Sequence, residues 1–453
     1  MSNKPELFGT DGIRGVAGRY PLDRPTIWRI GCAIGRVLAK PDGTDAARIV
    51  LGEDTRESSA WISETLAAGL RCAAAEVVHA GVITTPGVAF LTHDQGFDAG
   101  VVVSASHNPY ADNGIKVLSS SGTKLSEGVE LEIEREMSRV VSPANADHAP
   151  PFKPEPHLVA SYLERLIKLA PAASRLAKFR LVVDCANGAA SGIAPALFRR
   201  LGMEARFLNA EPSGRNINAG CGSLHPQSMA ETTRLLDADL GVAFDGDADR
   251  AIFATREGRL ADGDHVLFGM APFLKQRGKL KGGAVVGTLM TNLALELAFA
   301  RQGIGLKRTA VGDKYVLEEM LRSGINLGGE PSGHLIFADL SLAGDGIITL
   351  LEVLGLLVET EQPFEALLSG LRPFPQVIRN VRVREKPALE SIPEVAGALR
   401  DCQSELGDRG RVVVRYSGTE PLARVMVEAE EQEAVERHAA RIASAIEAAV
   451  GSR

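Results

Sequence analysis

The sequence has few cysteines and no long apolar or basic run. Its five cysteines are an odd number, lie far apart and form no Cys-x-x-Cys pair: Cys32, Cys72, Cys185, Cys221 and Cys402. This usage favours reduced thiols over a disulfide framework or a zinc site. No apolar stretch reaches the ~18 residues that cross a bilayer, and the first residues lack the apolar core of a signal peptide. We therefore expect a cytoplasmic protein that does not bind membranes.

The charge balance and the missing motifs exclude further classes of function. The 50 Lys+Arg against 57 Asp+Glu give a net charge of −7 without a basic run, so nucleic acid is not an expected partner. No P-loop motif and no Gly-x-Gly-x-x-Gly fingerprint occur, which argues against nucleotide and dinucleotide sites.

A strand–helix–strand pattern occurs three times. The chain of 453 residues is too long for one core, which favours about three or four domains. Short Val/Ile/Leu runs that alternate with helices are typical of parallel strands buried on both faces. The predicted strands are 48–53, 76–79, 179–184, 205–208, 284–287 and 306–311, with helices near 58–75, 190–201 and 291–302.

A different pattern follows the prolines of 371–375. It consists of strands 377–383, 411–416 and 422–428 with helices near 388–406 and 431–449. The stretch 141–157 contains five prolines and is the clearest linker. We predict three related α/β domains with mostly parallel, mixed sheets and a smaller α+β domain at the C-terminus. The predicted boundaries are 1–152, 157–255, 256–369 and 372–453.

Three carboxylates follow a buried-type strand. Asp245, Asp247 and Asp249 alternate with small residues, so in an extended loop they project to the same side. Three like charges are costly to gather unless a cation lies between them, and hard oxygen ligands favour Mg²⁺ or Ca²⁺. An EF-hand requires Gly and Glu where this chain has Arg250 and Arg256. The loop therefore predicts a Mg²⁺ site, with a solvated acidic turn as the alternative.

A serine loop follows the apolar run 101–103. It contains Ser104, Ser106 and His107, and Lys116 lies on the next extended run. Because α/β sheets place ligands at strand ends, a serine here is a candidate phosphoryl carrier with Lys116 to offset its charge. No Gly-x-Ser-x-Gly elbow surrounds it, which argues against acyl transfer. From this loop alone, a polar turn with a capping serine remains an open alternative.

Further loops carry groups that suit a sugar phosphate. In 328–334, Glu330 and Ser332 offer hydrogen bonds to hydroxyls, and His334 is either a proton carrier or a structural histidine. In 415–421 and just after it, Arg, Ser and Thr side chains with turn N–H groups make an anion nest. The glycine-rich stretch 8–15 contains Arg14, a phosphate ligand or a plain turn arginine.

Taken in order, these loops resemble those of the α-D-phosphohexomutases over the whole chain. The matching strings are Phe-Gly-Thr-Asp-Gly-Ile-Arg-Gly at 8–15, Ser-Ala-Ser-His-Asn-Pro at 104–109, Asp-Asn-Gly-Ile-Lys at 112–116, and the stretches 184–190, 216–223, 311–316 and 415–421. The last is similar to the phosphate loop of the branch that acts on glucosamine phosphates. Pro331 and Tyr416 depart from that branch, where Gln and Pro are usual. Both are spacers, so the departures bear on sugar preference more than on chemistry.

The resemblance implies a heart-shaped enzyme of four domains, each with one loop in a central cleft. It implies that Ser106 is a phosphoserine and a Mg²⁺ ligand together with Asp245, Asp247 and Asp249. It places sugar contacts at Glu330 and Ser332. It places the phosphate site at Arg415, Ser417, Gly418, Thr419 and Arg424. Around the phosphoserine it places Arg14, His107, Lys116, Arg250 and His334.

The implied reaction interconverts glucosamine 6-phosphate and glucosamine 1-phosphate for UDP-N-acetylglucosamine and cell-wall precursor synthesis. Phospho-Ser106 passes its group to the sugar, and glucosamine or glucose 1,6-bisphosphate serves as intermediate and activator. Lys116 or His334 takes the hydroxyl proton, the last domain moves, and the implied assembly is a homodimer. The alternatives are a phosphomannomutase/phosphoglucomutase, a Mg²⁺-dependent sugar phosphatase and a silent sugar-phosphate-binding protein.

Overall fold

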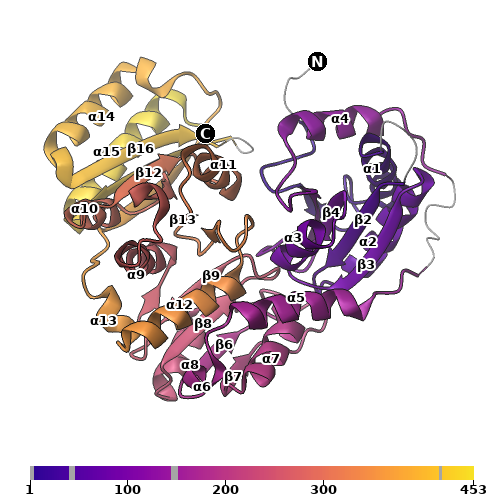
Figure 1. The fold of residues 1–453 in the computed structure, drawn as a ribbon. Coiled ribbons are helices and arrows are strands. Elements are labelled where there is room, and N and C mark those ends of the chain that lie inside the picture. Colours follow the sequence, from indigo (N-terminus) through magenta and orange to yellow (C-terminus); the bar gives the residue numbers. More distant parts are fainter. Residues whose placement is uncertain (1–4, 40–45, 144–150, 418–420, 453) are drawn as a thin grey trace.

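The computed structural model describes residues 5–39, 46–143, 151–417 and 421–452. Four β-sheets with their helices follow one another along the chain. Figure 1 shows the first unit on the right, the second at the bottom, and the third and fourth on the left. The predicted fold class, three related α/β units with mixed sheets and a smaller α+β unit, is confirmed.

The first sheet has the strand order β1-β5-β4-β2-β3. Its strands are β1 (Ile13–Val16), β2 (Arg48–Glu53), β3 (Glu76–Val82), β4 (Ala99–Val103) and β5 (Asp112–Ser119). Its helices are α1 (Arg24–Val37), α2 (Ser59–Cys72), α3 (Thr85–Asp94) and α4 (Glu127–Met137). β2 pairs in parallel with β3 and β4, whereas β5 runs antiparallel to β4.

The second and third sheets have the orders β10-β9-β8-β6-β7 and β12-β11-β13-β14. The second contains β6 (Leu181–Asp184), β7 (Ala205–Leu208), β8 (Leu240–Phe244), β9 (Ala251–Ala254) and β10 (Leu260–Ala261). The third contains β11 (Ala284–Thr288), β12 (Gly305–Thr309), β13 (Leu327–Gly329) and β14 (Leu335–Phe337). The helices are α5 (Pro156–Leu169), α6 (Ala173–Leu176), α7 (Ala190–Leu201), α8 (Gln227–Leu235), α9 (Gly263–Gln276), α10 (Leu293–Arg301), α11 (Asp313–Ser323), α12 (Gly346–Thr360) and α13 (Phe364–Leu368).

One arrangement recurs in these three sheets. A central strand (β2, β6 or β11) has a parallel partner on each side. An antiparallel strand pairs with the partner that comes later in the chain, which is β4, β8 or β13. The loops that connect this last pair are 104–111, 245–250 and 330–334. All three leave the carboxyl ends of equivalent strands, which is where α/β sheets bind ligands.

Capping residues shift several predicted boundaries. The helix predicted near 291–302 begins at Leu293 because the Asn292 side chain accepts a hydrogen bond from its first turn. The last-domain helix predicted near 388–406 begins at Pro393 instead, after a short 3₁₀ turn. The predicted linker is helical at its end, since Pro156 is the first residue of α5, where proline loses no hydrogen bond.

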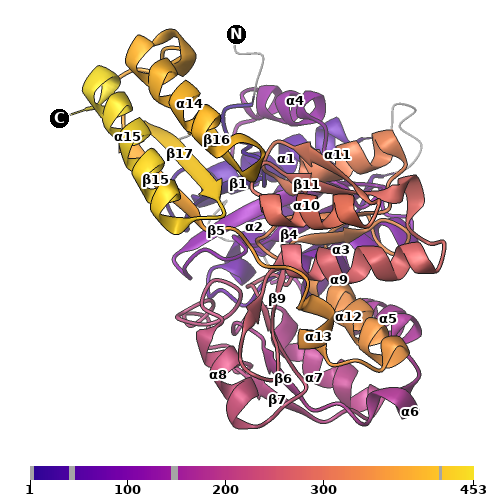
Figure 2. The same ribbon diagram turned by 90° about the vertical axis from the view of Figure 1, so that its left-hand side faces the viewer.

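The second and third units share one apolar core, which also takes in α3 and one set of strand residues of the first sheet, among them Val50, Val102 and Leu118. The rest of the first unit and the fourth unit have cores of their own. The fourth unit contains an antiparallel sheet, β15 (Gln376–Arg382), β17 (Leu422–Ala429) and β16 (Gly410–Tyr416), and the helices α14 (Pro393–Leu406) and α15 (Gln432–Val450). Figure 2 shows it at the opposite end of the molecule from the second unit.

A buried carboxylate ties the fourth unit to the third. Glu428 on β17 is fully buried, and its Oε1 accepts the Leu293 N–H at the start of α10 at 2.7 Å. Arg411 donates to Glu428 Oε2 at 2.7 Å and to the Thr291 carbonyl at 2.6 Å. An anion at a helix N-terminus is favourable, and the arginine compensates its burial.

Within the residues that the structure describes, no helix is both long and apolar enough to cross a membrane.

We predict that Glu428→Ala destabilises the junction of the third and fourth units. It leaves the Arg411 guanidinium and the helix N–H without their acceptor, at a cost of about 3 kcal/mol. Calorimetric unfolding would detect the loss as an earlier transition. The matched control is Glu430→Ala, because Glu430 is exposed and lies 3.9 Å from Arg409. Equal unfolding of the two variants would contradict this role of Glu428.

Candidate active site

Ser106 lies where the first unit meets the second. Its backbone is left-handed, with φ 51°, and its side chain is buried. The hydroxyl donates to Asp245 Oδ2 of the second unit at 2.5 Å. Ser104 points elsewhere, because its hydroxyl donates to Asp54 Oδ2 at 2.6 Å and accepts the Ser106 N–H at 2.9 Å. Ser106 therefore faces the aspartates, and Ser104 supports the turn.

A buried arginine holds the serine loop in this shape. The Arg56 side chain has no exposed surface and pairs with Asp54 at 2.8 Å. Its guanidinium donates to four loop carbonyls, those of Ser106, Asn108, Pro109 and Asp112. The Asn218 amide from the second unit also donates to the Ser106 carbonyl, at 2.9 Å. Neither Arg56 nor Asn218 is predicted from the sequence, because neither lies near Ser106 in the chain.

The aspartate loop turns sharply, so the prediction of an extended loop is wrong. Ala248 has φ 56° and bends the chain between Asp247 and Asp249. One oxygen from each of the three aspartates nevertheless lies within 4.8 Å of the others. Gly246 lets the turn contact the serine loop, since a Cβ there would lie 2.5 Å from the Ser106 carbonyl oxygen.

The carboxylate cluster has oxygens open to a cation. Lys116 donates to Asp247 Oδ2 at 2.8 Å, and the Thr85 hydroxyl donates to the same oxygen at 2.5 Å. Asp247 Oδ1 and Asp249 Oδ1 are buried and accept no hydrogen bond from the described residues. Burial and the two neighbouring aspartates raise the pKa of Asp245 well above its usual range. Buried carboxylate oxygens that lie close together and accept no hydrogen bond from the described residues fit a hard divalent cation.

Basic side chains around the cluster differ in protonation. Burial, with the charges of Arg250 and Arg14, lowers the pKa of His107 to about 4. For His334, burial opposes the charged form, but the hydrogen bond and charge of Asp249, with nearby Asp313, raise its pKa to about 9. His107 Nδ1 lies 3.2 Å from Ser106 Oγ.

Lys116 is strongly held in its charged form. Burial disfavours its ammonium group, but Asp11, Asp247 and Asp249 outweigh burial and raise its pKa well above the usual range. Lys116 and His334, the two groups considered for the hydroxyl proton, are therefore both charged at neutral pH.

A cavity of about 450 Å³ opens over this cluster. The first, second and third units all contribute to its wall. The predicted site residues that line it are Arg14, His107, Asp249, Arg250, Glu330 and His334. Glu330 Oε1 accepts the Gly312 N–H at 3.0 Å. Ser332 does not line it, and its buried hydroxyl has no hydrogen-bond partner among the described residues.

The fourth-unit residues lie apart from this cavity. Arg415 on β16 and Arg424 on β17 face each other in register, and the Ser417 N–H donates to the Leu422 carbonyl at 2.8 Å. None of these residues is among those of the described chain that line the cavity. Gly418 and Thr419 lie outside the described residues. Figure 1 shows the fourth unit across from the first.

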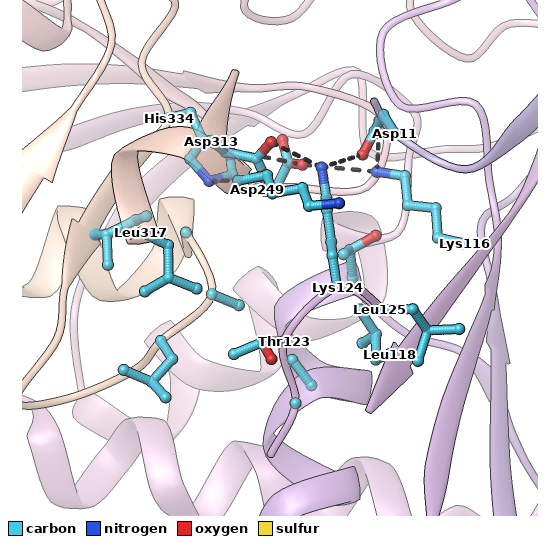
Figure 3. Close-up of a pocket in the computed structure, with 18 of the residues that line it drawn as sticks. Asp11, Lys116, Leu118, Thr123, Lys124, Leu125, Asp249, Asp313, Leu317 and His334 are labelled. Atoms are coloured by element: carbon cyan, nitrogen blue, oxygen red, sulfur yellow. Dashed lines mark hydrogen bonds and ion pairs between the residues drawn. The ribbon is translucent and has the colours of Figure 1, made fainter. Parts of the chain in front are cut away.

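Three charged residues beside the site were not singled out from the sequence. Asp11 pairs with Lys116 at 3.1 Å, and Lys124 donates to Asp313 at 2.7 Å (Figure 3). Asp11 and Asp313 lie in two of the strings that carry the family resemblance, 8–15 and 311–316. Membership of those strings is the one signal that pointed to them.

Four family models match the chain in order. They are described as phosphoglucomutase/phosphomannomutase alpha/beta/alpha domain I (residues 5–143), domain II (160–258), domain III (262–374) and C-terminal domain (379–445). The chain is 49% identical to a phosphoglucosamine mutase of Koribacter versatilis, covering 98% of this chain and 97% of the relative. It is 48% identical to a phosphoglucosamine mutase of Solibacter usitatus, covering 98% and 99%.

Solved structures show the same fold. A phosphoglucomutase/phosphomannomutase family protein of Burkholderia thailandensis superposes with a TM-score of 0.79 at 25% identity, covering 98% of this chain and 97% of that one. An N-acetylphosphoglucosamine mutase of Aspergillus fumigatus, in complex with GlcNAc-6P and magnesium, gives 0.69 at 19% identity, covering 99% and 96%.

These matches extend over nearly the whole chain and confirm the resemblance drawn from the loops. The chain therefore belongs to the phosphoglucomutase/phosphomannomutase family, within which it groups with the phosphoglucosamine mutases.

Proposed function

We propose that this chain interconverts glucosamine 6-phosphate and glucosamine 1-phosphate. One observation carries the proposal: the Ser106 hydroxyl, on a left-handed residue, donates to Asp245 of a buried carboxylate cluster in the next unit. A serine in this place suits a phosphoryl carrier whose charge a bound cation offsets. The relatives named phosphoglucosamine mutase support the choice of sugar.

The reaction has two phosphoryl transfers. Phospho-Ser106 passes its phosphoryl group to the free hydroxyl of the sugar phosphate, and the Ser106 oxygen leaves as the P–O bond to the sugar forms. The product of this step is the 1,6-bisphosphate. After the bisphosphate turns over, Ser106 attacks its other phosphorus, and the isomerised monophosphate is released. The same bisphosphate, of glucosamine or glucose, serves as activator by phosphorylating a bare Ser106.

We assign Mg²⁺ to Asp245, Asp247 and Asp249, with the Ser106 phosphate as a further ligand. When bound, the ion supplies charge neutralisation to the phosphoryl oxygens. The open oxygens of Asp247 and Asp249 support this assignment. The Aspergillus fumigatus relative was solved with magnesium, which supports the choice of ion.

The remaining site residues orient the substrate and balance its charge. Around the phosphoserine we assign charge balance to Arg14, Lys116, Arg250 and His334. We assign orientation to His107, whose imidazole is neutral in the free chain because its pKa is lowered to about 4. Glu330 and Ser332 bind sugar hydroxyls. Since Lys116 and His334 are both protonated in the free chain, either takes up the hydroxyl proton only after giving up its own.

The distal phosphate of the substrate binds to the fourth unit. We assign it to Arg415, Ser417, Gly418, Thr419 and Arg424, of which Arg415 is exposed on β16. Arg415, Ser417 and Arg424 are not among the residues that line the cavity of the other three units, so this role requires the fourth unit to close over the substrate. The fourth unit has its own core, which suits such a movement.

The cellular assignment rests on the family resemblance. We propose a cytoplasmic homodimer whose product feeds UDP-N-acetylglucosamine and cell-wall precursor synthesis, with domains over 1–152, 157–255, 256–369 and 372–453.

The second candidate function is a phosphomannomutase/phosphoglucomutase, which the likeness to the Burkholderia thailandensis structure favours.

Intact-mass analysis tests the phosphoryl carrier. We expect part of the wild-type protein to carry roughly one phosphate's added mass, which Ser106→Ala abolishes. We also expect the substitution to lower mutase activity by at least about 1000-fold, because the nucleophile is removed. An adduct that persists in Ser106→Ala and disappears in Ser104→Ala would place the nucleophile at Ser104.

Parallel assays on glucosamine, glucose and mannose 1-phosphates test the sugar. We expect kcat/KM for the glucosamine substrate to exceed the others by at least about tenfold, as expected where the site hydrogen-bonds a group that distinguishes the sugars. Faster turnover of the mannose phosphate would favour the phosphomannomutase alternative. Steady release of inorganic phosphate in place of isomerisation would favour a phosphatase.

Gly246→Ala tests whether the two loops must touch. The added Cβ meets the Ser106 carbonyl at 2.5 Å, so the serine moves away from Asp245. We expect kcat to fall by about 100-fold with little change in the thermal midpoint, because transfer depends on alignment. The control is Gly192→Ala, because Gly192 is exposed on α7 and a Cβ added there has nothing within 4 Å. Full activity in Gly246→Ala would contradict the requirement.

A further inference from the structure

Six side chains from three units form a closed ring of alternating charge beside the carboxylate cluster (Figure 3). In order around the ring they are Asp11, Lys124, Asp313, His334, Asp249 and Lys116. The half formed by Lys116, Asp249 and His334 belongs to the proposed site. Lys116 Nζ and His334 Nδ1 each lie 3.7 Å from Asp249 Oδ2.

Lys124 closes the ring on the other side. Its Nζ lies 2.7 Å from Asp11 Oδ1 and donates to Asp313 Oδ1 at 2.7 Å. Asp11 Oδ2 lies 3.1 Å from Lys116 Nζ, and Asp313 Oδ2 lies 3.7 Å from His334 Nε2. Lys124 follows β5 in the first unit, and Asp313 is the first residue of α11 in the third. The Lys124–Asp313 pair thus joins Asp11, which contacts Lys116, to His334, which contacts Asp313.

A cavity lies beside the Lys124–Asp313 ion pair, between the first and third units. This cavity of about 200 Å³ lies beside the ring (Figure 3), with Leu118 and Leu125 of the first unit on its wall opposite Leu317 of the third. Among the hydrogen bonds between described side chains, Lys124–Asp313 is the one that joins the first unit directly to the third. At this junction, the charged pair bridges the two units beside the cavity, next to the apolar core in which α3 packs with the third unit.

We propose that Lys124 and Asp313 are positioning residues that set the distance between the serine loop and the sugar loop. The inference rests on the proposed function. Neither side chain is within hydrogen-bond distance of Ser106 or of the three aspartates among the interactions of the described residues. Loss of the pair lets the units separate, so the donor phosphorus and the sugar hydroxyl leave their in-line placement. The effect falls on kcat, while Ser106 keeps its phosphate and the sugar loop keeps its binding groups.

The test uses the full-length phosphorylated protein and the variants Lys124→Met, Asp313→Asn and their double. We expect each single variant to lower kcat by about tenfold or more, with KM for glucosamine 1-phosphate within about threefold of wild type. Because both changes remove the Lys124–Asp313 pair, the double variant should lose less than the product of the two single losses. Lys124→Arg keeps the charge and should restore most of kcat.

The matched control is Lys281→Met, which removes an exposed ion pair of 2.5 Å to Asp339 inside the third unit and should leave kcat unchanged. A readout independent of turnover is amide hydrogen exchange at 120–126 and 311–316, which should rise in Lys124→Met and Asp313→Asn. Unchanged kcat and exchange in both variants, or losses that multiply in the double, would overturn the inference. An inactive wild type with faster exchange in the variants would overturn the proposed function alone.

Discussion

The hydrogen bond from Ser106 to Asp245 is the contact on which the candidate site depends. A left-handed serine costs roughly 1 kcal/mol or more and persists only where its surroundings fix it. Here the Arg56 guanidinium holds the loop carbonyls from the first unit, and Asn218 holds the same loop from the second. Gly246 then lets the two backbones meet. The serine loop is thus shaped by the junction of two units as much as by its own sequence.

The recurring strand order explains how distant loops come together. Each of the first three sheets places one loop at the carboxyl end of an equivalent strand, and the three loops carry serine, aspartates, and glutamate with histidine. The second and third units share a core, and Gly333 lets their loops touch, since a Cβ there would lie 2.4 Å from the Ala251 carbonyl oxygen. The fourth unit lacks this arrangement and is attached through Glu428 instead. The loops of the first three units are thus positioned by packing and close backbone contacts, whereas the fourth unit is attached through a buried ion pair.

Much of the fold was predictable, because strands such as β4 and β8 are continuous buried runs. The short antiparallel strands β9 and β14 were not identified, because three or four residues give too little periodicity. At the site, the aspartates were found from their spacing, but the choice of Ser106 over Ser104 rested on the family resemblance. Arg56 and Lys124 act through partners far away in the chain, so no local pattern distinguishes them from solvated surface charges.

The separation of Ser106 from Asp245 by 139 positions has a consequence for biosynthesis. The ribosome delivers the serine loop long before its carboxylate partners, and His334 emerges later still. A nascent chain that has not reached Asp245 has a serine loop held by Arg56 of the first unit but without its carboxylate partners from the second. Competence for phosphoryl transfer therefore arises late in translation, when three consecutively made units dock. A chain truncated before residue 249 lacks a complete carboxylate cluster however well its first unit folds.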